Sequence, residues 1–179
     1  FYTADICAEL EALPRPRVLV TTPYHLRTLL AEQPALPTID LLLSATAPLS
    51  QNLAIEAETR FAAPLFEIYG CTETGQIASR RTTSGPIWQT FSGVRLRSEG
   101  EAVWAEGDHI EVPTPLSDVI ELVKADPTRF LLHGRHADLV NIAGKRASLG
   151  YLNYKLTACL LYTSPSPPDR TRSRTPSSA

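Results

Sequence analysis

The sequence predicts an α/β fold in which a parallel βαβαβ sheet is followed by a β-rich subdomain, formed by a small barrel or a second sheet. Between residues 17 and 69, three short apolar runs alternate with two segments whose apolar residues recur at helical spacing. From residue 76 onward, short strand-like runs are separated by Gly, Pro, Ser and Asp. We therefore place a boundary between an α/β part, residues 1–75, and a β-rich part, residues 76–133.

The α/β part opens with helix and strand signals in regular order. Residues 3–13 carry apolar side chains at helical spacing and are followed by prolines that end the helix. The strand expected at 17–21 leads into Thr22 and Pro23, which suit a helix N-cap and the first helical position. Ser50 offers a second N-cap before another helical pattern. Each expected strand is therefore joined to the next by a helix.

The strands expected at 39–43 and 65–69 are mostly apolar, as parallel strands are when both faces are covered. A loop of small and polar residues follows each strand, at 44–48 and at 70–75. Ligands of open α/β sheets bind beyond the carboxyl ends of the strands. The two loops are therefore predicted to form one site.

The loop at 70–75 has a composition that suits a phosphate or a phosphate-bound metal. It reads Gly-Cys-Thr-Glu-Thr-Gly. The glycines allow close approach of the backbone, the hydroxyls can donate hydrogen bonds, and the carboxylate of Glu73 can hold Mg²⁺. A plain turn with a solvated Glu73 explains the same letters, so the loop alone does not decide between the two interpretations.

The second half of the chain reads as a series of short strands and turns. We expect strands at 76–82, 94–97, 102–105, 109–112, 119–123 and 130–135, and then a basic hairpin at 139–146. Residues 134–157 are expected to form a hinge and the start of a small C-terminal domain.

Composition excludes several classes of partner. The net charge is −2, so no global field favours nucleic acid or an anionic membrane. No apolar run approaches the ~20 residues that cross a bilayer. The 3 cysteines lie far apart, which argues against a disulfide framework or a zinc site and fits a reducing, cytoplasmic setting.

The two ends of the sequence carry expectations of their own. The chain contains no Met and opens on Phe1, so we expect it to be a fragment of a longer gene product. The tail, residues 158–179, is rich in Ser, Thr and Pro from residue 163 onward, and such a segment cannot bury enough apolar surface to order itself. It resembles translated sequencing-adapter sequence, and we expect it to be an artefact without function.

Four segments, taken in order, resemble motifs of the adenylate-forming (AMP-binding) superfamily, which includes acyl- and aryl-CoA synthetases. Residues 69–75 resemble its YGxTE motif, and residues 44–50 resemble its small-residue loop ending in Ala-Pro-Leu. Asp118 lies where the family carries an Asp before a strand, and residues 134–146 resemble its GRxDDxIKxxGxR segment. The resemblance covers about residues 1–157, and its phrase at 139–149 is most similar to synthetases of aryl-acid or aryl-polyene pathways.

The resemblance implies an ATP-dependent carboxylic-acid:thiol ligase. In that reaction the acid attacks the α-phosphate, an acyl-adenylate forms and pyrophosphate leaves. A thiol of CoA or of an acyl-carrier protein then takes the acyl group. The implied cofactors are ATP/AMP and Mg²⁺, and the implied substrate is a small acyl or aryl carboxylic acid.

The resemblance also implies which residues bind the nucleotide. Tyr69 would stack on adenine, and Thr46, Ala47 and Pro48 would line the other side of the base. Gly70 belongs to the same nucleotide-binding set.

Thr72 and Glu73 are the implied catalytic residues. Thr72 would touch the α-phosphate and Glu73 would hold Mg²⁺, while Asp118 and Arg135 would bind the ribose hydroxyls. These roles suit the side chains, because a carboxylate takes a hard cation or two hydroxyls and a guanidinium supplies a planar fork of donors.

The sequence departs from the family pattern at three places. Ala137 stands at the hinge position, where the family commonly has Asp or Lys. The family's phosphate loop, with its lysine, is expected upstream of Phe1, and its C-terminal lysine beyond residue 157. We therefore expect the chain as given to be inactive. The alternatives are a noncatalytic nucleotide-binding α/β module and a truncated product without an independent function.

Overall fold

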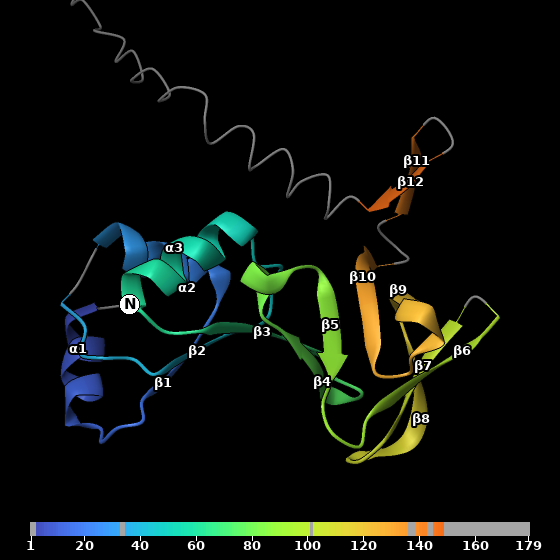
Figure 1. The fold of residues 1–179 in the computed structure, drawn as a ribbon, viewed down its shortest axis with the longest axis horizontal. Helices are drawn as coiled ribbons and strands as arrows, with labels where there is room; N and C mark the ends of the chain where they lie inside the picture. The colour runs from blue at the N-terminus through green and yellow to red at the C-terminus, as the bar shows by residue number, and fades with distance from the viewer. Residues whose placement is uncertain (1–2, 33–34, 101, 136–138, 143–144, 149–179) are drawn as a thin grey trace, which may run out of the picture.

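Figure 1 shows the protein as a computed structural model, which describes residues 3–32, 35–100, 102–135, 139–142 and 145–148. Its described strands form a seven-stranded sheet in the order β1-β2-β3-β4-β5-β10-β9, a three-stranded sheet β6-β7-β8, and a two-stranded sheet β11-β12. The helices are α1 (Thr3–Ala12), α2 (Pro23–Glu32) and α3 (Gln51–Phe61), with the short 3₁₀ helices η1 (Thr82–Ser84) and η2 (Val123–Ala125). The strands are β1 (Val18–Thr21), β2 (Leu41–Ser44), β3 (Leu65–Cys71), β4 (Gly75–Arg80), β5 (Ile87–Thr90), β6 (Arg95–Glu99), β7 (Ala102–Gly107), β8 (Ile110–Leu116), β9 (Asp118–Leu122), β10 (Arg129–Arg135), β11 (Leu139–Ile142) and β12 (Lys145–Ser148).

The predicted βαβαβ unit is confirmed. Strand β1 pairs in parallel with β2, and β2 pairs in parallel with β3, with α2 and α3 as the connections. Both predicted N-caps form: the hydroxyl of Thr22 accepts from the backbone N–H of His25, and that of Ser50 from the N–H of Leu53, each at 3.2 Å. Local capping chemistry therefore sets where these two helices begin.

Strand β2 begins at Leu41, two residues later than predicted, because Asp40 binds residues that precede β1. Its carboxylate accepts from the backbone N–H of Arg17 at 2.7 Å and is paired with the guanidinium of Arg15. The hydrogen bond from Arg15, followed by that from the Arg17 backbone, lowers the pKa of Asp40 to about 2. This exposed clamp fixes the starts of β1 and β2 side by side.

The parallel strands are covered on one face by the described helices. Figure 1 shows α2 and α3 lying over the same side of β1–β3, and their apolar side chains pack with Leu42 and Leu65, which are neighbours in register. The expected cover of the opposite face is not found among the described residues. Val20, which points to that face, is 69% exposed, and Val18 is exposed as well.

Beyond residue 75 the chain first extends the same sheet. Strand β4 pairs antiparallel with β3, and β5, β10 and β9 follow in antiparallel pairings. Strand β5 was not expected from the sequence. The second sheet, β6-β7-β8, begins only at Arg95. The mixed α/β fold class with a second sheet is confirmed, while the exact subdomain boundaries stay a prediction.

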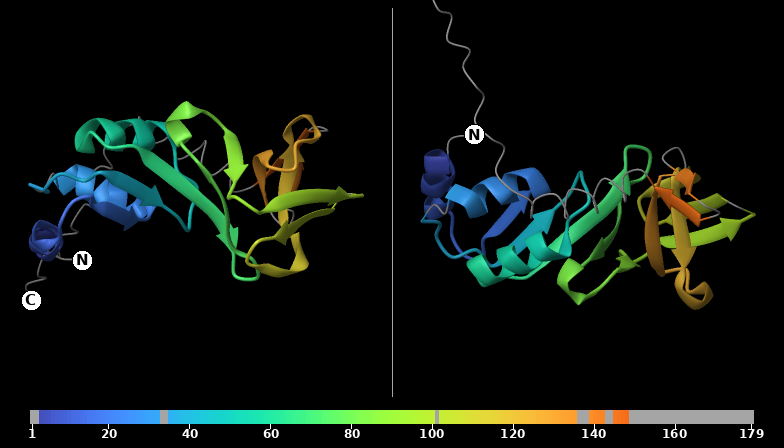
Figure 2. Two further views of the ribbon diagram at one scale, coloured as in Figure 1. Left: turned by 60° about the horizontal axis from the view of Figure 1, so that its bottom comes forward. Right: turned by 90° about the horizontal axis from the view of Figure 1, so that it is seen from above.

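The antiparallel half of the large sheet curls around an aromatic cluster. The hydroxyl of Tyr69 on β3 donates to Asp118 on β9 at 2.7 Å, although the two strands are four pairings apart. In a flat sheet, four spacings of about 4.8 Å would separate them by roughly 19 Å. Strong twist and coil bring them together, around the rings of Tyr69, Trp88 and Phe130. Figure 2 shows the result, with the helical layer at one end and the β6–β8 sheet at the other.

The predicted hairpin near residue 140 is confirmed, because β11 and β12 pair antiparallel. The predictions for Ala137, for residues 149–157 and for the 158–179 tail fall outside the described residues. No helix in the described part of the chain is long and apolar enough to cross a membrane.

The aromatic cluster should dominate the stability of the curled half. Phe130 is fully buried and stacks on Trp88 with ring centroids 6.2 Å apart, so we expect Phe130→Ala to lower the free energy of unfolding by about 3–5 kcal/mol. Tyr24→Ala is the matched control, because that ring is 72% exposed and should cost less than about 1 kcal/mol. Urea denaturation followed by tryptophan fluorescence measures both, and equal losses would contradict this account of the core.

Candidate functional site

The segment predicted as a loop after Tyr69 is the end of a β-hairpin. Strand β3 continues to Cys71, which pairs with Gly75, so only residues 72–74 form the tip. The two backbones approach so closely that a Cβ added to Gly70 would lie 2.1 Å from the carbonyl oxygen of Gly75. Gly75 itself has φ +66°, the left-handed region that favours glycine. The two glycines therefore allow the close approach of β3 and β4 at Gly70 and Gly75, which we call the neck of the hairpin.

The tip presents the predicted catalytic side chains at the surface. Thr72 and Glu73 are exposed, whereas Thr74 is buried and its hydroxyl lies 3.1 Å from the thiol of Cys71. A surface hydroxyl beside a surface carboxylate is a set of hard oxygen donors, which fits Mg²⁺. No group of three or more His, Cys, Asp or Glu gathers within the described ranges, and the metal role of Glu73 stays a prediction.

A buried carboxylate that the sequence analysis missed holds the other predicted loop in place. Glu67 on β3 is only 4% exposed. One of its oxygens accepts from the backbone N–H of Leu49 at 2.9 Å, and the other from Arg80 and from the hydroxyl of Thr82, at 2.8 and 3.1 Å. The loop after β2 is thereby fastened to β3 and β4.

The partner of Glu67 is itself packed against the aromatic cluster. The guanidinium of Arg80 lies over the ring of Trp88, 4.6 Å from its centroid. This contact places a cation on an aromatic face inside the protein, where such interactions are strongest. The ion pair between Glu67 on β3 and Arg80 on β4 is therefore in contact with the aromatic rings around which the sheet curls.

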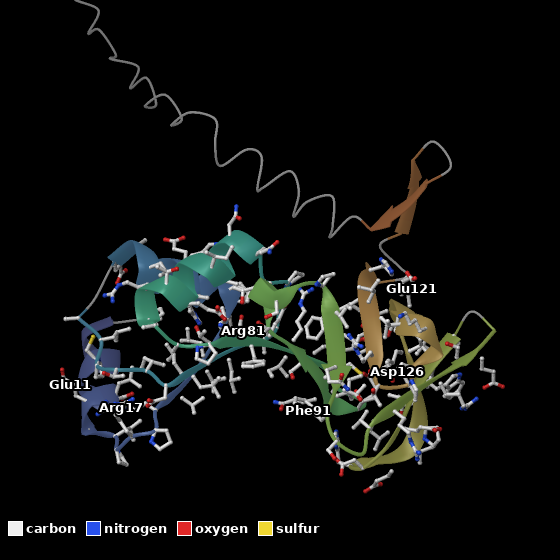
Figure 3. All side chains as sticks on the ribbon, viewed as in Figure 1. Glu11, Arg17, Arg81, Phe91, Glu121 and Asp126 are labelled. Carbon is white, nitrogen blue, oxygen red and sulfur yellow. The ribbon has the colours of Figure 1, made fainter. Side chains whose placement is uncertain are left out.

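A second carboxylate joins α3 to the same part of the sheet. Glu58 accepts from the Nε and Nη2 of Arg81, labelled in Figure 3, both at 2.9 Å, and from the backbone N–H of Leu65 at 2.8 Å. The hydrogen bond from Arg81 is the main cause that lowers the pKa of Glu58. The start of β3 is thus fixed to the helix that precedes it.

The residues predicted to line the adenine lie in a strained, exposed loop. Thr46, Ala47 and Pro48 are all exposed, and Thr46 has φ +77°. A positive φ is an outlier for a β-branched residue, and such strain collects at binding sites. The anchor of Glu67 on Leu49 lies directly after these residues and holds the loop in this conformation.

Two residues predicted to bind ribose are brought together. Asp118 begins β9 and Arg135 ends β10, and the two positions are directly paired in the antiparallel ladder. The carboxylate of Asp118 is half-buried and accepts from the hydroxyl of Tyr69. The predicted site positions 69, 118 and 135, which are distant in the sequence, therefore lie close together in the curled sheet.

Tyr69 is less accessible than the stacking role implies. Its side chain is among the buried core residues, at 9% exposed, with ring centroids 5.7 Å from Trp88 and 5.8 Å from Phe130. Only a small part of the ring can meet a base in this arrangement, and its adenine contact stays a prediction. Trp88 is a buried packing residue.

Loop 46–48 and the hairpin tip, residues 72–74, lie at different positions along β3. Loop 46–48 lies next to Glu67, and the hairpin tip begins beyond Cys71, four residues or roughly 13 Å further along the strand. Tyr69 lies between them. A hollow of about 450 Å³ elsewhere, at the β5–β6 turn, is lined by residues 89–95 and Thr128 and by none of the predicted site residues.

The Glu67 network should be a main determinant of folding. In Glu67→Gln the partly buried Arg80 loses its counter-charge and its buried partner, so we expect the free energy of unfolding to fall by about 3 kcal/mol. Glu99→Gln removes the pair between Glu99, whose side chain is 64% exposed, and Arg97, and should cost less than about 1 kcal/mol. Denaturant titration of both variants tests this, and a small effect of Glu67→Gln would show that the network is dispensable.

The strain at Thr46 should be measurable as stability. Thr46→Gly relieves a positive φ, which costs about 1–3 kcal/mol, against an entropic penalty for glycine of about 0.4–1 kcal/mol. We expect a net gain of about 1 kcal/mol in thermal or chemical unfolding. Ala47→Gly, next to it and without a positive φ, should instead destabilise the protein. A loss in both variants would argue against strain at Thr46.

Comparison with known proteins places the fold. No protein-family model matches the sequence, and no curated protein matches it. Solved structures do match. A variant of E. coli MenE with bound OSB-AMS aligns with TM-score 0.68 and 15% identity, over 86% of this chain and 37% of that one. The anthranilate CoA ligase AuaEII, in complex with anthranoyl-AMP, aligns with TM-score 0.67 and 16% identity, over 87% and 36%.

A third match comes from Dyadobacter fermentans, an acyl-CoA synthetase (AMP-forming)/AMP-acid ligase II-like protein, with TM-score 0.60 and 18% identity, over 86% of this chain and 46% of that one. The chain thus spans less than half the length of these proteins. Identities this low speak for the fold alone. The chain has the fold of one part of the AMP-forming acid ligases of the adenylate-forming superfamily.

Proposed function

We propose that this chain is the nucleotide-binding part of an ATP-dependent carboxylic-acid:thiol ligase, with Mg²⁺ and ATP/AMP as cofactors. The observation that carries the proposal is the meeting of Tyr69, Asp118 and position 135, which come from β3, β9 and β10. These are positions that the family resemblance assigns to adenine and ribose, and they are distant in the sequence. Their convergence supports a site for one nucleoside monophosphate unit.

Each side chain has a chemical task in this proposal. Asp118 accepts hydrogen bonds from ribose hydroxyls, and Arg135 donates to the same sugar. Thr46, Ala47 and Pro48 line the base.

At the hairpin tip, Thr72 donates to the α-phosphate and Glu73 holds Mg²⁺. Mg²⁺ held there would supply positive charge to neutralise the phosphates. The residues of this chain contribute orientation of the nucleotide and of the phosphate under attack.

The proposed reaction joins an acid to a thiol in two transfers. A carboxylate oxygen bonds to the α-phosphorus and pyrophosphate departs; the thiol sulfur then bonds to the acyl carbon and AMP departs. Two structural neighbours carry aryl-acid or related adenylate ligands, anthranoyl-AMP and OSB-AMS. An aromatic acid is therefore the substrate class we favour, with CoA or an acyl-carrier protein as thiol acceptor.

The chain itself should bind nucleotide without turning it over. It spans 36–46% of the three ligases above. The same observation favours the second candidate, a noncatalytic nucleotide-binding module. Cys7 and Cys71 are free thiols, which fits the cytoplasmic setting that we propose.

The ribose contact gives the first test. Asp118→Asn keeps an acceptor for Tyr69 but removes the charge, so we expect AMP affinity, measured by titration calorimetry, to fall about tenfold. Glu121→Gln is the matched control, because Glu121 lies on the same strand, pairs with His133 and is exposed (Figure 3). Its AMP affinity should equal that of the wild type.

Two outcomes would contradict the proposal: no AMP binding by the wild-type chain, or equal affinity in Asp118→Asn and wild type. ATP–pyrophosphate exchange separates the two candidate functions. The chain alone should show none. A longer protein that contains this chain should show exchange if it is a ligase and none if it is a binding module.

A further inference from the structure

We propose that His109 is a positioning residue that fixes the hairpin tip, residues 72–74, by donating a hydrogen bond to the carbonyl oxygen of Thr74. His109 lies in the turn between β7 and β8, in the second sheet, 35 residues away from Thr74. Its Nε2 is 2.9 Å from that carbonyl oxygen. The contact joins the second sheet to the tip of the first, and nothing in the sequence indicated it.

The ring of His109 is oriented from its other side. Its Nδ1 lies 3.0 Å from a carboxylate oxygen of Asp108, the preceding residue. The Asp108 carboxylate and the Thr74 carbonyl are both acceptors, so each ring nitrogen must supply a proton to satisfy its partner. The Asp108 hydrogen bond is the main cause that raises the pKa of His109, which favours the doubly protonated ring. The imidazole thus has a fixed direction.

The turn that carries His109 packs against the turn between β5 and β6. A Cβ added to Gly107 would lie 2.3 Å from the carbonyl oxygen of Gly93, and one added to Gly93 would lie 3.0 Å from the Cβ of Asp108. The β5–β6 turn and the β7–β8 turn are therefore in direct backbone contact. On the opposite side, the His109 ring lies against Gly75, where an added Cβ would be 3.5 Å from Nε2.

Several ionisable groups lie near this junction. The hairpin tip contributes Glu73, and β3 ends with the thiol of Cys71. The β7–β8 turn contributes Asp108 and is flanked by Glu106 on β7 and Glu111 on β8, whereas the β5–β6 turn, residues 91–94, carries no ionisable side chain. The carbonyl of Thr74 directly follows Glu73, so a bond that holds this carbonyl also limits where the Glu73 backbone can go. The inference rests on the proposed function in one respect: a fixed tip serves catalysis only if Thr72 and Glu73 meet a nucleotide.

Two conservative variants separate the contact from the general integrity of the turn. In His109→Gln the side-chain amide nitrogen falls near the position of Nε2 and can still donate to Thr74. In His109→Asn the amide falls near the position of Nδ1, so it keeps a donor for Asp108 and cannot reach Thr74. His133→Asn is the control, because His133 also pairs with a carboxylate, at 3.0 Å, and is similarly exposed, but lies on β10.

The first measurement is amide hydrogen exchange of residues 72–76 in the full 179-residue chain without nucleotide. We expect His109→Asn to speed exchange up to about tenfold, while His109→Gln and His133→Asn stay within about twofold of wild type. Equal acceleration in the Asn and Gln variants, or none in either, overturns the inference.

The second measurement is the affinity for Mg·ATP. If the wild-type chain binds, His109→Asn should weaken binding up to about tenfold and His109→Gln should restore it. Equal affinity in wild type and His109→Asn overturns the role in binding. Absence of binding by the wild type overturns the proposed function, and hydrogen exchange then still decides whether His109 fixes the tip.

Discussion

The buried ion pair between Glu67 and Arg80 is the interaction on which the arrangement of the site depends. A carboxylate in the middle of a buried strand is costly unless every oxygen is satisfied. Here the backbone of Leu49, the guanidinium and the hydroxyl of Thr82 satisfy it, and each belongs to a different segment. The desolvation cost therefore enforces a single geometry, since any displacement of these segments would leave a buried charge without a partner.

The curl of the large sheet performs the complementary task. The parallel half behaves as a layered α/β unit, with its core between helices and strands. The antiparallel half bends until β9 approaches β3, and the aromatic cluster fills the space enclosed. Because the bend continues a sheet that starts with the parallel strands, residues from the two halves can face one ligand.

Local signals were predictable from the sequence, and long-range contacts were not. The N-caps at Thr22 and Ser50 depend on residues three positions away, and both form as expected. The motif residues could be placed by resemblance, which gave Asp118 and Arg135 but not their pairing. Glu67 is an acid inside an apolar strand, which is a visible signal, yet its partners lie 13 to 18 residues away and the sequence does not indicate them. His109 offered no signal, since its role depends on how two sheets pack.

The neck of the hairpin divides the motif into two kinds of position. Gly70 has no room for even a methyl group, because the carbonyl oxygen of Gly75 occupies that space, whereas Thr72 and Glu73 project from the surface. Tolerance to substitution must therefore differ sharply between neighbours: backbone sterics dictate the glycine at position 70, whereas this contact does not restrict the exposed positions 72 and 73. A motif of this design can change what it contacts while its scaffold stays the same.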